Sequence, residues 1–205
     1  MTAMPSVRPL PTLLGAPQGT LADLAPGDVC LMGLFMDHGG RFGARFAARQ
    51  LRYASIGRTA SPNCRDIGDL NVFPLEPDRH NDAIRSQVEM VVAQGGRLVV
   101  VGGDADLSAA FRSVLGAAVA WDLPDKPPVV APGAGLTVDA GRLVHGVPRW
   151  IRPLTAFRAG LDSLGRPGAL HLRGIAPALG TSDRWQASLG LHLLACLVDR
   201  MAGPQ

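Results

Sequence analysis

Leu98–Ser108, with the sequence LVVVGGDADLS, decides the fold: four apolar residues are followed by two glycines and an aspartate. A short unbroken apolar run suits a strand that is buried on both faces, as in a parallel sheet. Gly102-Gly103-Asp104 is expected to form a tight turn at the end of that strand, and Leu107–Leu115 the next helix. The segment therefore indicates the strand, turn and helix unit of an α/β protein.

The same alternation continues on both sides of this segment. Further strands are predicted at 28–36, 66–72 and 169–175, and further helices at 44–54, 78–94, 154–164 and 183–201. Asn81 or Asp82 is expected to cap the helix 78–94, and Trp121–Gly135 is expected to be irregular because it is rich in proline. This order favours parallel strands joined by right-handed crossovers.

The length of 205 residues predicts a single domain. Residues 1–26 contain five prolines and are expected to form an extended arm, either loose or wrapped around a neighbouring subunit, with the domain itself at 27–205. The formal net charge is only +3, and the basic residues are scattered, which argues against nucleic-acid binding. Three widely spaced cysteines and the lack of a long apolar run predict a cytoplasmic protein with reduced thiols.

Four segments, each close to a predicted strand, carry a resemblance to a known family. They are Phe35–Arg52 (FMDHGGRFGARFAARQLR), Asp66–Asp69 (DIGD), Leu98–Ser108 and Trp121–Leu136 (WDLPDKPPVVAPGAGL). In this order they resemble the motifs of the ureohydrolases, the family of arginase and agmatinase. The residues that match or border these motifs are Asp37, Arg41, Gly43, Arg45, Arg52, Asp69, Gly102, Gly103, Asp104, Pro132 and Gly133. The resemblance implies a three-layer α/β fold with a mainly parallel sheet, here shortened.

The resemblance also implies a chemistry that this chain is not equipped to perform. Ureohydrolases hold two manganese or nickel ions bridged by a hydroxide, which attacks a guanidinium carbon. Their ligands lie in G-G-D-H, D-A-H-x-D and D-x-D motifs. Here Ala105 stands in place of the first histidine, Asp122 is retained, and Pro124 replaces the next aspartate; no D-A-H-x-D fits between Ser108 and Trp121. Because one carboxylate cannot hold two divalent ions, we expect neither catalytic residues nor a metal or other cofactor in this chain.

Three functions remain open from the sequence. The leading hypothesis is a non-catalytic subunit that joins an active ureohydrolase homologue in a trimer or hexamer, with the nickel or manganese in that partner. Among such assemblies the chain resembles the inactive subunit of heteromeric metformin hydrolases. A second hypothesis is a stand-alone protein that binds guanidino compounds through Asp37, Asp104 and Asp122. A third is an enzyme whose site is rebuilt around these three aspartates with His38 and Asp106.

The retained arginines are expected to have a structural role. Arg41, Arg45 and Arg52 lie at a loop-helix junction, where arginine usually braces carboxylates or carbonyls. Asp66 and Asp69 are the expected partners. Asp104 is expected to cap a helix or brace a loop rather than to bind a metal.

Overall fold

The computed structural model describes residues 10–37, 43–59, 63–70, 72–73, 75–123, 125–141, 151–175 and 183–202, and only the backbone at 77, 151–156 and 183–185. Its strands are β1 (Val29–Gly33), β2 (Cys64–Asp69), β3 (Arg97–Val101), β4 (Ala118–Asp122), β5 (Gly135–Asp139) and β6 (Ala169–Arg173). Its α-helices are α1 (Ala47–Ala54), α2 (Pro77–Ala93), α3 (Ser108–Leu115), α5 (Ile151–Ser163) and α6 (Asp183–Ala202), and short 3-10 helices lie at Leu13–Gly15 (η1), Leu21–Asp23 (η2) and Ala44–Phe46 (η3). The prediction of an α/β fold is confirmed.

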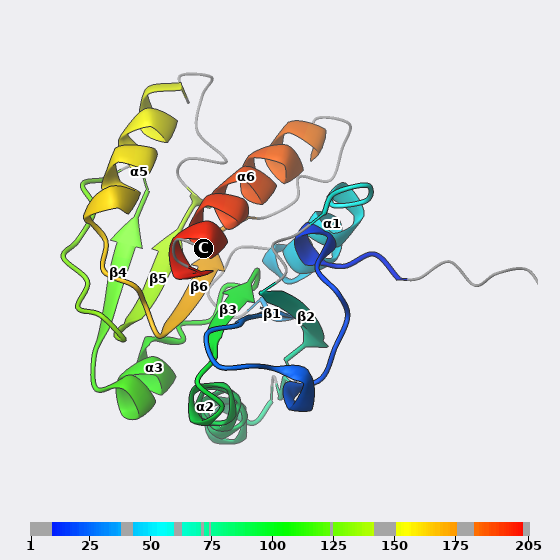
Figure 1. Cartoon of the computed structure of the whole chain (residues 1–205), viewed down its shortest axis with the longest axis vertical. Coiled ribbons are helices and arrows are strands. Elements are labelled where there is room, and N and C mark those ends of the chain that lie inside the picture. The colour runs from blue at the N-terminus through cyan, green and yellow to red at the C-terminus, as the bar shows by residue number, and fades with distance from the viewer. Residues whose placement is uncertain are drawn as a thin grey trace, which may run out of the picture.

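The six strands form one sheet in the order β2-β1-β3-β6-β5-β4 (Figure 1). All neighbouring strands pair in parallel. Every strand therefore ends on the same side, which we call the carboxyl end of the sheet. Loops at this end are where ligands bind in open α/β sheets.

Helices cover both faces of the sheet and make three layers (Figure 1). Helices α1, α5 and α6 lie on one face, and α2 and α3 on the other. The four apolar residues of β3 are buried on both faces of the sheet: Val99 and Val101 belong to the core under α6, whereas Leu98 and Val100 belong to the core under α2. None of the helices in the described ranges is both long and apolar enough to cross a membrane.

The predicted helix 78–94 is confirmed as α2, which runs from Pro77 to Ala93, but its predicted cap is wrong. The N-cap residue is Glu76, and it makes no side-chain cap bond. Asn81 and Asp82 therefore lie inside the helix. Proline favours the first position of a helix because its missing N–H has no partner to lose there.

The sequence also failed to predict β5. It follows the proline-rich segment and pairs with both β4 and β6. All five of its residues are buried. The segment between Ser108 and Trp121, where no D-A-H-x-D motif fits, contains the start of β4 at Ala118; two residues separate this strand from the end of α3.

The described part of the N-terminal arm, residues 10–26, packs on its own chain. Leu13 and Leu14 are buried in the core under α1 and α6. The Leu13 N–H donates to Asp66 Oδ2 at 2.7 Å, and the Leu14 N–H donates to Ser55 Oγ at 2.9 Å. Over these residues the expected extended arm is a packed segment with two turns of 3-10 helix.

Candidate functional site

The carboxyl end of the sheet gathers the polar residues that the sequence singled out. Asp37 follows β1, the segment Gly102–Ser108 follows β3, and Asp122 ends β4. The structure adds two residues that sequence reasoning missed, Asp139 at the end of β5 and Arg173 at the end of β6.

The double glycine after β3 brings three segments together. Gly102 and Gly103 have φ values of +82° and +67°, a region that favours glycine. A Cβ on Gly103 would lie 2.7 Å from the Leu34 side chain. The Gly103 N–H donates to Ala44 O at 2.9 Å, and the Asp104 N–H donates to Met36 O at 3.0 Å. The turn therefore holds the loop after β1 against the start of η3.

Asp37 braces that loop. Its carboxylate accepts hydrogen bonds from Gly43 N at 2.8 Å and Arg45 N at 2.6 Å. The Arg45 guanidinium lies 3.6 Å from the same carboxylate and 4.8 Å from the centre of the Phe46 ring. Arg45 thus pairs with Asp37 and not with Asp66 or Asp69 as predicted. Arg41 and His38 lie outside the described residues.

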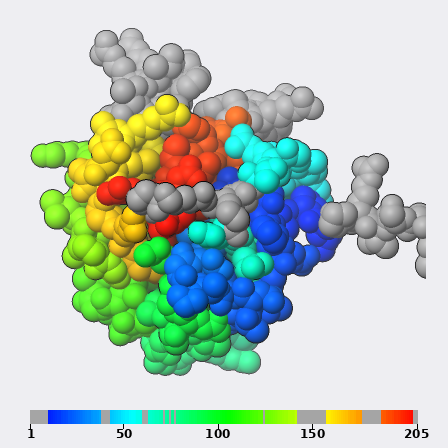
Figure 2. Space-filling view, viewed as in Figure 1, coloured from blue at the N-terminus to red at the C-terminus, as the bar shows by residue number. Residues whose placement is uncertain are grey.

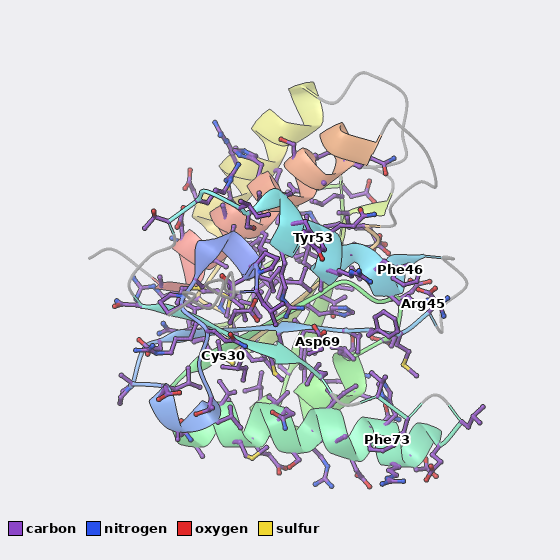
Figure 3. All side chains as sticks on the ribbon, turned by 90° about the vertical axis from the view of Figure 1, so that its right-hand side faces the viewer. Cys30, Arg45, Phe46, Tyr53, Asp69 and Phe73 are labelled. Atoms are coloured by element: carbon purple, nitrogen blue, oxygen red, sulfur yellow. The ribbon has the colours of Figure 1, made fainter. Side chains whose placement is uncertain are left out.

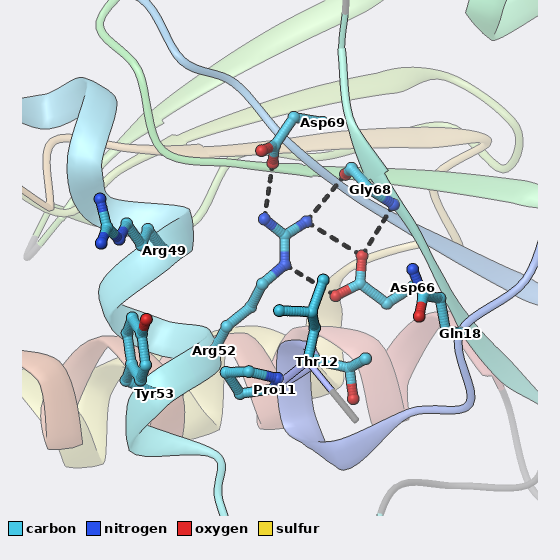
Figure 4. A pocket seen from close by; sticks show the side chains of 10 residues that line it. Pro11, Thr12, Gln18, Arg49, Arg52, Tyr53, Asp66, Gly68 and Asp69 are labelled. Atoms are coloured by element: carbon cyan, nitrogen blue, oxygen red, sulfur yellow. Dashed lines mark hydrogen bonds and ion pairs between the residues drawn. The ribbon is translucent and has the colours of Figure 1, made fainter. Parts of the chain in front are cut away.

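Arg52 fulfils the bracing role that the sequence predicted (Figure 4). Its Nε and Nη2 donate to the two oxygens of Asp66 at 2.9 and 3.0 Å. Its Nη1 donates to Asp69 Oδ1 at 2.6 Å, and Nη2 also donates to Gly68 O at 2.8 Å. Burial lowers the pKa of Arg52, but the hydrogen bonds and charges of Asp66 and Asp69 outweigh it and raise that pKa. Every nitrogen of this guanidinium is engaged with its own chain.

An arginine and an aspartate face each other in the centre of the carboxyl end. Arg173 and Asp139 are register partners on β6 and β5, and Arg173 Nε lies 3.2 Å from Asp139 Oδ2. The other oxygen of Asp139 accepts the Gly141 N–H at 2.8 Å. The two side chains are only 24% and 9% exposed. The signal in the sequence was Leu136–Asp139 (LTVD), a short apolar and β-branched run after a glycine.

His171 lies two residues before Arg173 and is fully buried. Its Nε2 lies 2.9 Å from Gly102 O. Burial, partly opposed by this hydrogen bond, lowers the pKa of His171 to about 4. The imidazole is therefore neutral at pH 7 and links the β3 turn to β6.

The remaining predicted positions do not converge. Ala105 is buried beside the β3 turn, whereas Asp122 is exposed on the edge strand β4. Asp104 is buried but is not the N-cap of α3, which is Leu107. Asp106 supports that helix start instead, because its Oδ1 accepts the Ser108 N–H at 2.9 Å. Pro124 lies outside the described residues, and Pro132 and Gly133 form a turn before β5.

The described side chains do not gather into a site for a pair of divalent metal ions. Neighbouring strands in a sheet lie roughly 4.8 Å apart, so β1, which Asp37 follows, and β4, which Asp122 ends, are about 19 Å apart across the sheet. Between them, Asp139 faces the cation of Arg173. Within the described ranges no three His, Cys, Asp or Glu side chains lie close enough to hold a metal ion.

Fold and site together define a doubly wound α/β protein whose functional loops lie at one end of a parallel sheet. The sequence model of the arginase family matches residues 27–140, which is more than half of the chain. The chain therefore belongs to the arginase family. No protein of curated function matches the sequence.

Solved structures agree with this assignment at the level of the fold. Proclavaminate amidino hydrolase from Streptomyces clavuligerus is 16% identical, with a TM-score of 0.68 over 97% of this chain and 99% of that one. A hypothetical agmatinase from Burkholderia thailandensis is 17% identical, with a TM-score of 0.68 over 92% and 89%. Formimidoylglutamase from Bacillus subtilis is 12% identical, with a TM-score of 0.67 over 98% and 96%. The arginase-like fold predicted from the motifs is confirmed.

Proposed function

We propose that this chain is a non-catalytic member of the arginase family that assembles with an active homologue and stabilises it. The single observation that carries the proposal is the Asp139–Arg173 pair at the carboxyl end of the sheet. The guanidinium of Arg173 lies at the carboxyl ends of the central strands. A metal enzyme would need carboxylates there that are free to bind the metal ions. A fixed cation repels a divalent ion and occupies a carboxylate oxygen that could bind it.

The preserved scaffold supports the same proposal. The Arg52 network, the β3 double glycine and the Asp37 brace keep the loops of the fold in place although Ala105 cannot ligate a metal. A protein that keeps the framework of its family without the ligands is suited to fill a position in an oligomer. The nickel or manganese would be held by the partner. A guanidine or biguanide compound would be its substrate, as in the heteromeric metformin hydrolases that the sequence resembles.

The stand-alone binding hypothesis has weaker support. It needs Asp37, Asp104 and Asp122 around one organic cation. Both oxygens of Asp37 already accept backbone N–H groups, and Asp122 lies four strands away. Thermal-shift screening of the isolated chain with guanidino compounds separates the two proposals, because saturable stabilisation would favour binding.

Co-expression with the intact ureohydrolase of the same genome tests the leading proposal. The chain should co-purify with the homologue at fixed stoichiometry and raise the yield, thermal stability or activity of that enzyme. Activity is measured with agmatine, arginine and metformin, and nickel and manganese are quantified in each purified sample. The chain alone should contain less than one equivalent of either metal and hydrolyse none of these compounds. Two bridged ions bound to the isolated chain, or hydrolysis by it, would overturn the proposal.

A further inference from the structure

A groove of about 500 Å³ runs between α1 and α6 on the outer surface. It is lined by Gln50, Tyr53 and Ala54 of α1 and by Ala187, Ser188 and Leu191 of α6. The hollow exists because alanine and serine occupy the facing positions of the two helices. In Figure 2 the cyan α1 segment and the yellow α5 lie on either side of the red and orange α6.

Two large apolar side chains are exposed along this groove and the turn that follows α1. Tyr53 is 54% exposed and points outward from α1 (Figure 3), and Ile56 is 70% exposed. The Arg49 guanidinium lies 5.9 Å from the centre of the Tyr53 ring. Aromatic and arginine side chains are the residues that most often anchor protein–protein interfaces.

The same surface carries positive charge from two separate elements. Arg58 lines the groove from the turn after α1. On the neighbouring helices, Arg158 Nη2 of α5 lies 3.0 Å from His192 Nε2 of α6. Burial first, and then the charges of Arg158 and Arg58, lower the pKa of His192.

Among the described residues, neither Arg58 nor Arg158 forms an ion pair with a carboxylate. Residues 43–59, which include all of α1, contain no aspartate or glutamate. The described carboxylates of α5 and α6 lie further along each helix: Asp162 is one turn beyond Arg158, and Asp199 is two turns beyond His192. The groove is therefore complementary to an acidic partner.

The turn that carries Ile56 and Arg58 is held rigidly by the N-terminal segment. Ser55 Oγ accepts the Leu14 N–H at 2.9 Å and donates to Leu51 O at 2.6 Å. Gly15 lies so close that a Cβ on it would be 2.1 Å from Arg58 O. A surface held in place before binding loses little conformational entropy on association.

We propose that the α1–α6 groove, lined by Arg58, together with Arg158 and His192 on the adjoining surface of α5 and α6, is the docking surface for an acidic segment of the catalytic homologue. The carboxylates of that segment pair with the two arginines, and an apolar side chain between them enters the hollow beside Tyr53. This inference rests on the proposed assembly with a homologue, and it names the surface that the assembly uses.

The test measures binding of the purified homologue to the immobilised full-length chain at low and high salt. The variant Arg58→Glu/Arg158→Glu should bind about 10-fold more weakly or worse, because like charges then face each other. Wild-type affinity should fall as salt rises, because these charges are exposed and screened. Arg58→Lys/Arg158→Lys should retain most of the affinity. Arg85→Glu/Arg112→Glu makes the same change of charge on α2 and α3, on the opposite face of the sheet, and should bind as wild type.

The outcomes separate the two proposals. If the wild-type chain binds and Arg58→Glu/Arg158→Glu binds equally well, the assembly stands and the docking surface is wrong. If the wild-type chain binds none of the homologues of its genome, both proposals fail. Light scattering tests whether a second copy of this chain occupies the groove instead. If the wild-type chain is a homodimer and the variant Arg58→Glu/Arg158→Glu is a monomer, the groove binds a second copy and the inference is overturned. Circular dichroism and urea unfolding confirm that each variant is folded.

Discussion

Replacing Arg173 by methionine tests the internal cation at the carboxyl end of the sheet. Arg173→Met keeps much of the side-chain volume but removes the charge 3.2 Å from Asp139. The Asp139 side chain is only 9% exposed, so water cannot fully take over the role of the guanidinium. Removing one partner of a buried ion pair costs roughly 3–5 kcal/mol. Because 24% of the Arg173 side chain is exposed, we expect the low end, about 3 kcal/mol.

Urea unfolding and differential scanning calorimetry measure this cost. For a domain of this size about 3 kcal/mol corresponds to a fall in Tm of roughly 6–12 °C. Arg173→Met/Asp139→Asn removes both charges and should recover to within about 1 kcal/mol of wild type. The exposed Arg112→Met on α3 is the matched control and should stay within about 0.5 kcal/mol. If Arg173→Met unfolds at the urea concentration of wild type, the central role of this ion pair is refuted.

Three further predictions follow from the interior of the molecule. Arg52→Lys should lower the free energy of unfolding in urea by about 2–4 kcal/mol, because lysine cannot reproduce the contact with both oxygens of Asp66. The control Arg85→Lys, on the surface, should leave the free energy of unfolding almost unchanged. Equal effects of the two substitutions would show that the Arg52 network contributes no stability. The pKa of His171 is about 4 in the folded protein and about 6.5 in the unfolded chain. Between these values the unfolded chain binds more protons, so the free energy of unfolding should fall as pH drops from 6.5 towards 4, by at most about 1.4 kcal/mol per pH unit. His171→Gln should flatten that part of the stability curve, and an unchanged slope would contradict a buried neutral imidazole. Gly33→Ala would place a Cβ against Asp69 Oδ1 and 2.7 Å from Ala48 Cβ, and it should lower stability by about 1–3 kcal/mol, measured by thermal unfolding. A variant as stable as wild type would mean that the Asp69 and Ala48 side chains move aside at little cost.

The sequence predicted much of the fold because burial on both faces leaves a strong signal. β3 is apolar at four of its five positions, and the turn after it needs glycine at φ values that other residues avoid. β5 was missed because it directly follows a proline-rich segment that was expected to be irregular. Local pattern does not reveal that such a strand lies between two others in the sheet.

The candidate site could be predicted only in part, for a similar reason. The Arg52 contacts with Asp66 and Asp69 join residues 14 and 17 positions apart, and the motifs suggested them. Arg173 and Asp139 lie 34 positions apart, and they meet only because β5 and β6 are neighbours in register. The motifs did not indicate this pair. Only the sheet order brings Arg173 beside Asp139.

The packing of residues 12–16 against α1 and β2 limits where the chain can be tagged, cut or shortened. Leu13 and Leu14 pack in the same hydrophobic core as Leu51. Their backbone N–H groups donate hydrogen bonds to Asp66 and Ser55. A protease cut or an inserted tag at these residues would leave Asp66 short of a donor and open the interior to water. Affinity tags belong before residue 10, and a version shortened beyond residue 16 should aggregate even though every strand of the sheet is retained.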